Sequence, residues 1–106
     1  MERAGRIDML LELLQKEPFD TFLNYVLGLE YIEQQDLPRA EIQLKKVVAL
    51  DEDYIAVYYQ LGKLFEGQLR NTEALSYYNT GLEKAKAKKD NKAINEFGEA
   101  IFMLED

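Results

Sequence analysis

The fold of this chain is decided by residues 21–54, TFLNYVLGLEYIEQQDLPRAEIQLKKVVALDEDY, and by residues 55–88, IAVYYQLGKLFEGQLRNTEALSYYNTGLEKAKAK. Two leucine–glycine pairs, Leu27-Gly28 and Leu61-Gly62, lie 34 residues apart in these segments. Further positions match at the same spacing, and they are Tyr31 with Phe65, Ala40 with Ala74, Leu44 with Tyr78, Val47 with Gly81 and Val48 with Leu82. A fixed period of this length indicates two stacked copies of one supersecondary unit.

Apolar residues recur at spacings of three and four along almost the whole chain, which places them on one face of an α-helix. The clearest stripe is formed by Ile7, Leu10, Leu11 and Leu14. The pattern predicts six helices, over about 6–18, 21–34, 38–50, 54–67, 71–88 and 92–104. Short connections favour antiparallel packing of successive helices. Because no alternating apolar run is bounded by hairpin turns, we predict an all-α fold.

The composition removes the residue types on which most catalytic and metal sites depend. The 106 residues include no cysteine and no histidine, and the only serine is Ser76. Zinc sites of the Cys/His kind, thiol nucleophiles and the commonest general base are therefore excluded. The sequence also has no glycine-rich phosphate loop. We expect a protein that is not an enzyme and that has no catalytic residue, metal site or cofactor.

The charge of the chain argues against nucleic acid as a partner. The net charge is −7 at neutral pH, whereas phosphate contacts need a concentrated basic surface. No apolar run approaches the length of a membrane span or forms a signal-peptide core, so we expect a cytoplasmic protein without a membrane partner. We interpret the one basic run as a solvated helix end whose cations complement the helix dipole, and it consists of Lys84, Lys86, Lys88, Lys89 and Lys92.

The 34-residue unit resembles the tetratricopeptide repeat, which has Leu-Gly, aromatic, alanine, large apolar and small residues at these spacings. The resemblance implies a single domain, 1–106, with a half-repeat helix at 6–18, full repeats at 21–54 and 55–88, and a capping helix at 91–104. It also implies a right-handed α-α superhelix, or solenoid, of six antiparallel helices. The chain is similar to small stand-alone bacterial proteins of this family. It departs from the family pattern at Asn24, where an aromatic residue is usual.

Three of the glycines inside predicted helices follow an apolar residue in a repeated pair, although a glycine in a helix costs roughly 1 kcal/mol relative to alanine. Gly28 and Gly62 belong to the matched leucine–glycine pairs, and Phe97-Gly98 copies the pair after a two-residue insertion. We expect the backbone of a neighbouring helix to approach closely at all three positions.

The resemblance further implies that the chain binds a peptide or a partner helix, as a protein-interaction module or scaffold. In this family the first helix of each repeat commonly lines a concave binding face. The residues expected on that face are Phe22, Tyr25 and Leu29 in the first repeat, and Tyr59, Lys63 and Glu66 in the second. Aromatic side chains with a polar end suit such recognition because they are large and have few rotamers.

Two alternatives stay open at the level of sequence. The first is that Phe22, Leu29 and Ile32 are covered, either by the N-terminal helix or by a second copy of the protein. The second is that the protein is a structural, self-associating homo-oligomer without a peptide ligand. Self-association is suggested by the last helix, because its large apolar residues cannot all face one neighbour. These residues are Phe97, Ile101, Phe102 and Leu104.

Overall fold

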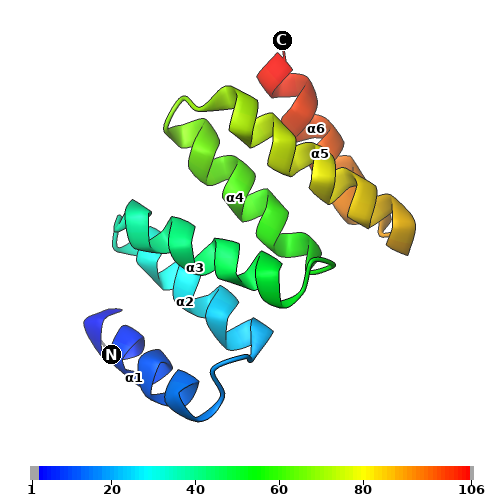
Figure 1. Ribbon diagram of the computed structural model, residues 1–106. Coiled ribbons are helices and arrows are strands. Elements are labelled where there is room, and N and C mark those ends of the chain that lie inside the picture. The colour runs from blue at the N-terminus through cyan, green and yellow to red at the C-terminus, as the bar shows by residue number, and fades with distance from the viewer. Residues whose placement is uncertain (1–2, 106) are drawn as a thin grey trace. The chain divides into compact units, whose positions relative to one another are not determined.

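The computed structural model describes residues 3–105, and these residues fold into α-helices joined by short turns (Figure 1). The helices are α1 (Arg3–Lys16), α2 (Thr21–Glu33), α3 (Leu37–Leu50), α4 (Ile55–Gly67), α5 (Asn71–Lys88) and α6 (Asn91–Glu105). The described residues contain no β-strand, which confirms the predicted all-α fold with six helices. Among residues 3–105, no helix combines the length and the apolar character needed to cross a lipid bilayer.

The chain divides into two compact units at the junction between Glu52 and Asp53. In the first unit, α2 packs extensively against α3 and less extensively against α1. In the second unit, α5 packs against both α4 and α6. The unit boundary lies two residues before the repeat boundary of 54/55 that the sequence predicts.

The turn between the two helices of a repeat has the same conformation in both units. Gln35 and Leu69, which are 34 residues apart, both have φ near 60° although neither is glycine. The amide of the next residue, Asp36 or Arg70, donates to the carbonyl five positions earlier at 2.9 Å in each case. This hydrogen bond closes the end of the first helix and fixes the left-handed residue beside it. The repeat seen in the sequence is therefore also a repeat of backbone geometry.

Asn24, the residue that departs from the family pattern, is fully buried and hydrogen-bonded. Its side-chain amide donates to the carbonyl of Pro18 at 3.2 Å and to that of Asp20 at 2.8 Å. Its carbonyl oxygen accepts a hydrogen bond from Gln43 on α3. A buried polar side chain is tolerated when its hydrogen bonds are satisfied in this way. Asn24 thus joins the turn before α2 to α3, where an aromatic residue would provide only apolar contact.

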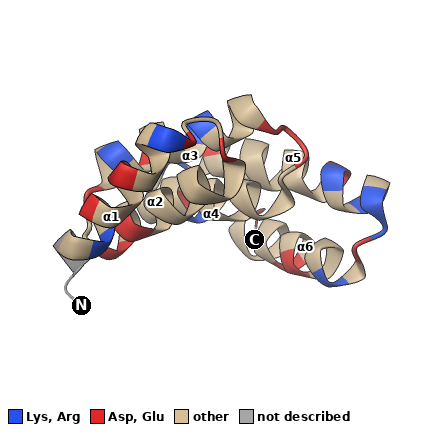
Figure 2. Cartoon of the chain, turned by 90° about the horizontal axis from the view of Figure 1, so that it is seen from below, with Lys and Arg blue, Asp and Glu red and all other residues tan. Residues whose placement is uncertain are grey.

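The lysine run lies at the end of α5 and the start of α6 (blue in Figure 2). Lys84 forms an ion pair with Asp53 at 3.2 Å, and Lys86 approaches Glu83 at 4.0 Å. Lys89 caps α5 in the left-handed conformation. Cations at this end of a helix are stabilised by the helix dipole.

Close helix packing depends on side chains that occupy the space above glycines. The ring of Tyr78 on α5 lies so close to Gly62 on α4 that a Cβ atom there would collide with it. In the first unit, a Cβ atom on Gly28 would lie 2.6 Å from Cδ2 of Leu44. The expected close approach is therefore present at these two glycines, but a side chain makes the closest contact at both. The backbone nitrogen of Leu44 also lies 3.7 Å from a Cβ atom placed on Gly28.

The expectation for Gly98 is wrong. Gly98 is exposed, and a Cβ atom on it would meet no atom within 4 Å. The reason is positional, because Gly28 and Gly62 face the helix that follows them in the chain, and no described helix follows α6.

Tyr78 is almost completely buried, with 1% of its surface exposed, as its alignment with Leu44 predicts. Its hydroxyl donates a hydrogen bond of 2.7 Å to Oε1 of Glu66. Burial raises the pKa of the Tyr78 hydroxyl far above its usual value, and the hydrogen bond and negative charge of Glu66 raise it further. The folded protein therefore holds Tyr78 in its neutral, proton-donating form.

The contact at Gly62 predicts opposite effects for the same substitution at two glycines. Gly62→Ala should lower the free energy of unfolding by about 1–2 kcal/mol, because overpacking against Tyr78 exceeds the gain in helix propensity. Gly98→Ala should raise it by up to about 1 kcal/mol, because only the propensity gain applies. Urea unfolding followed by circular dichroism measures both. Equal effects at the two positions would contradict this account of the packing.

The hydrogen bond of Tyr78 predicts a pH-dependent effect. Tyr78→Phe should lower the free energy of unfolding by about 1 kcal/mol at neutral pH, because it removes the bond to Glu66. In the unfolded chain a tyrosine loses its proton near pH 10, whereas folded Tyr78 keeps it to higher pH. The hydroxyl of Tyr78 should therefore make its full contribution to the free energy of unfolding below about pH 10, and this contribution should decline above that pH. Urea unfolding of the wild type and of Tyr78→Phe at about pH 7 and about pH 10.5 tests this prediction. If the difference in free energy of unfolding between the two proteins is the same at both pH values, the prediction is refuted.

Candidate functional site

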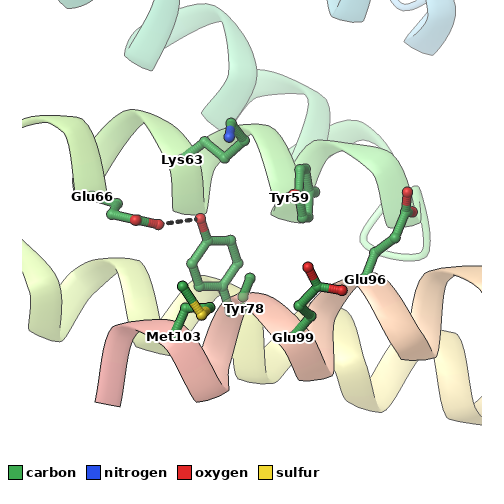
Figure 3. Close-up of a pocket in the computed structure, with 8 residues that line it drawn as sticks. Tyr59, Lys63, Glu66, Tyr78, Glu96, Glu99 and Met103 are labelled. Atoms are coloured by element: carbon green, nitrogen blue, oxygen red, sulfur yellow. Dashed lines mark hydrogen bonds between the residues drawn. The ribbon is translucent and has the colours of Figure 1, made fainter. Parts of the chain in front are cut away.

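The second unit has a groove of about 440 Å³ between α4 and α6 (Figure 3). We call it the α4–α6 groove, and its lining residues are Tyr59, Lys63 and Glu66 of α4, Tyr78 of α5, and Glu96, Glu99, Ala100 and Met103 of α6. An adjoining cavity of about 200 Å³ shares Tyr59 and Glu96 with it. This cavity continues to the start of both helices, at Ile55, the first residue of α4, and at Lys92, the second residue of α6.

Three residues that the sequence analysis selects for peptide binding lie together on this groove. Tyr59, Lys63 and Glu66 are separated by four and three positions, which places them on one face of α4. Tyr59 is partly exposed, and Lys63 and Glu66 are exposed. All three side chains are therefore accessible to a ligand in the groove.

An aromatic cluster supports the centre of the groove. The ring of Tyr59 lies 5.9 Å from that of Tyr78 and 5.7 Å from that of Phe97, measured between centroids, in tilted and edge-on arrangements. Aromatic pairs in these geometries attract each other beyond the effect of burial alone. Tyr78 and Phe97 are buried, so they hold the partly exposed ring of Tyr59 in place. The groove presents a rigid aromatic surface rather than a mobile side chain.

Charged side chains surround this aromatic surface. The ammonium group of Lys63 lies 5.7 Å from the centroid of the Tyr59 ring, within the range of a cation–π interaction. Glu66 accepts the hydrogen bond from Tyr78, and Figure 3 shows Glu96 and Glu99 extending from α6 toward α4. Among residues 3–105, no group of three or more acidic side chains is arranged to hold a metal ion. The arrangement suits binding through apolar contact and ionic hydrogen bonds.

The remaining selected residues belong to the first unit. Phe22, Tyr25 and Leu29 are spaced by three and four positions, so they share one face of α2. Phe22 is 62% exposed, and Tyr25 and Leu29 are partly buried. The N-terminal helix α1 therefore leaves Phe22 open, and the alternative in which α1 covers this residue is wrong.

The 34-residue repeat does not identify the groove residues that α6 contributes. Four residues fall in the predicted capping helix, which contains no predicted binding residue, and they are Glu96, Glu99, Ala100 and Met103. The sequence does contain a signal for them, because Phe97-Gly98 repeats Leu61-Gly62 at a distance of 36 residues. The same offset relates Lys63 to Glu99, which identifies Glu99 as the counterpart of a selected residue. The two-residue insertion before α6 hides this relationship from a strict 34-residue frame.

The chain matches no known protein-family profile and no curated protein, but its structure is similar to several solved structures. The TPR2B domain of yeast Sti1, solved as a complex with pHsp70, is 12% identical and has a TM-score of 0.88. This match covers 97% of the present chain and 82% of that chain, and at such low identity it shows the fold alone. MamA is 26% identical with a TM-score of 0.76, over 84% of this chain and 49% of its own.

A tetratricopeptide repeat domain protein from Salinibacter ruber, whose structure was determined by solution NMR, is 32% identical to this chain. The match covers 81% of this chain and 87% of that protein, with a TM-score of 0.78. A crystal structure of a Salinibacter ruber tetratricopeptide repeat domain protein matches at 32% identity as well, with a TM-score of 0.76. The identity and the coverage show that this chain belongs to the tetratricopeptide repeat family.

Proposed function

We propose that this protein is a non-catalytic interaction module that binds a peptide segment or a partner helix in the α4–α6 groove. The observation that carries the proposal is the partly exposed ring of Tyr59, held by two buried aromatic rings and accessible from a groove. Large aromatic side chains in preformed pockets contribute a disproportionate share of binding energy at protein interfaces. A fixed ring also loses little conformational entropy when a ligand binds.

The comparisons support this proposal at the level of function class. The TPR2B domain of yeast Sti1, which has the same fold, is found in a complex with pHsp70. We propose protein or peptide partners for the present chain by analogy with that complex. The analogy concerns the kind of partner and not its identity, since the two chains share only 12% of their residues.

We propose that the ligand contacts Tyr59, Lys63 and Glu66 in the second unit. Tyr59 would provide apolar area, and Lys63 and Glu66 would fix the orientation of the ligand through ionic hydrogen bonds. Phe22, Tyr25 and Leu29 are the proposed contacts of the first unit. A short groove of this kind suits an affinity in the micromolar range, about 8 kcal/mol of net binding free energy.

Self-association is the second candidate function, and the surface of α6 favours it. Phe102 is 69% exposed and Met103 is 68% exposed, although both are large and apolar. Exposed apolar patches on a protein surface often mark sites of contact with another protein chain. Sedimentation velocity over a range of concentrations distinguishes the two candidates, because a protein that acts only through the groove stays monomeric.

Selection from a random library of short peptides displayed on phage tests the groove. The full chain serves as bait, and fluorescence anisotropy measures the affinity of a synthetic peptide from the selected pool. Tyr59→Ala should weaken binding about tenfold or more, because it removes the central aromatic contact. Met103→Ala should weaken peptide binding less than Tyr59→Ala does. Because Met103 is exposed, this substitution gives a second variant of the groove that does not disturb the core.

The matched control is Phe102→Ala, which removes an exposed aromatic residue from the same helix but outside the groove. It should change the affinity less than about twofold. Circular dichroism checks that each variant keeps its helical content. Failure to select any peptide, or equal losses in the groove variants and the control, would reject the groove as the binding site.

A further inference from the structure

The α4–α6 groove carries an excess of negative charge. Together with its adjoining cavity it is lined by four carboxylates, Glu66, Glu96, Glu99 and Asp90, and by two ammonium groups, Lys63 and Lys92. The net charge of the lining is therefore −2 at neutral pH. The residues come from α4, from α6 and from the turn before α6, so the charge surrounds the groove on more than one side.

Glu96 and Glu99 of α6 differ from several acidic residues elsewhere in the described part of the chain. Within the described part of the chain, no hydrogen bond or ion pair ties the side chains of Glu96 and Glu99 to other side chains. In contrast, Asp36, Glu41 and Glu73 each have a basic side chain within 3.1 Å. Glu96 and Glu99 are exposed and lie three positions apart on α6, so both face the groove without an ion pair to Lys63 or Lys92.

The apolar part of the groove fits the stem of a long basic side chain. Tyr59, Ala100 and Met103 provide an apolar surface beside the two carboxylates. Lysine and arginine side chains bury their methylene groups along such surfaces and keep the charged end at a polar rim. The position of Lys63 above the ring of Tyr59 shows that this ring already accommodates a cation.

We propose that the segment recognised by the α4–α6 groove is basic, with lysine or arginine side chains that contact Glu96 and Glu99. This inference rests on the proposed function and adds the chemical class of the partner. An acidic segment would bring its carboxylates close to the four carboxylates that line the groove and its adjoining cavity. Because like charges repel each other in an interface, such a partner is disfavoured. An arginine can bind a carboxylate through two parallel hydrogen bonds, which would add geometric specificity.

The peptides selected on the full chain test the inference first by their composition. They should contain more lysine and arginine than the unselected library, and acidic peptides should be depleted. Replacing the lysines and arginines of a selected peptide with glutamine should weaken its binding about tenfold.

The protein variant for the second test is Glu96→Gln/Glu99→Gln, which removes two charges from the groove. Its control is Glu17→Gln/Glu83→Gln, which changes the net charge by the same amount at two exposed positions outside the groove. The groove variant should weaken the basic peptide about tenfold, and the control should change the affinity less than about twofold.

The outcomes separate the inference from the proposed function. Selected peptides without basic enrichment whose binding still depends on Tyr59 would overturn the inference and leave the proposed function in place. Equal weakening by both double variants would also overturn it, because the overall charge of −7 would then explain the attraction. If no peptide is selected, the proposed function fails and the inference fails with it.

Discussion

The contact between Tyr78 and Gly62 is the constraint on which the second unit depends. The absence of a side chain at Gly62 lets the ring of Tyr78 lie directly on α4, which brings α5 close to that helix. The same arrangement occurs where the ring of Phe97 on α6 lies against Gly81 of α5. Successive helices in this unit are thus joined by an aromatic ring on one helix and a glycine on its neighbour. The two rings then support Tyr59, so the packing that builds the fold also builds the surface of the groove.

In the first unit, α2 and α3 also pack closely at a glycine, but different residues make the contact. Leu44 occupies the space above Gly28, where the second unit uses Tyr78 above Gly62. A leucine has no hydroxyl, so this contact has no counterpart of the hydrogen bond from Tyr78 to Glu66. The first unit instead contains the buried amide of Asn24, which forms hydrogen bonds to the turn before α2 and to α3. The two repeats therefore have the same backbone conformation at the turn between their helices. They differ in their buried polar group, which is the amide of Asn24 in the first and the hydroxyl of Tyr78 in the second.

Most of the fold could be predicted because the helices are encoded by local apolar spacing and by a repeat of fixed length. The spacing of apolar residues predicts the six helices, and the alignment of Tyr78 with Leu44 predicts its burial. The environment of Gly98 could not be predicted in this way, since it depends on whether another helix follows α6. The hydrogen bonds of Asn24 were also beyond prediction, because they require the three-dimensional course of the turn before α2.

The candidate site could be predicted only in part, for a related reason. Repetition at 34 residues identifies the face of α4 that carries Tyr59, Lys63 and Glu66. The opposite side of the groove comes from α6, where the period is interrupted by two residues. A pattern search with a fixed period therefore describes one side of the groove, and the structure is needed to add Glu96 and Glu99.

The hydrogen bond between Tyr78 and Glu66 gives one rim residue of the groove an unusual degree of order. Most exposed glutamates exchange among several rotamers and lose that freedom when a ligand orders them. Glu66 is exposed, but its Oε1 is already held at 2.7 Å by a hydroxyl that the core keeps in place. The side chain of Glu66 thus loses much of its rotamer entropy on folding. Its other carboxylate oxygen remains available to accept a hydrogen bond from a second donor. Folding has in this way preorganised one acceptor of the groove before any partner arrives.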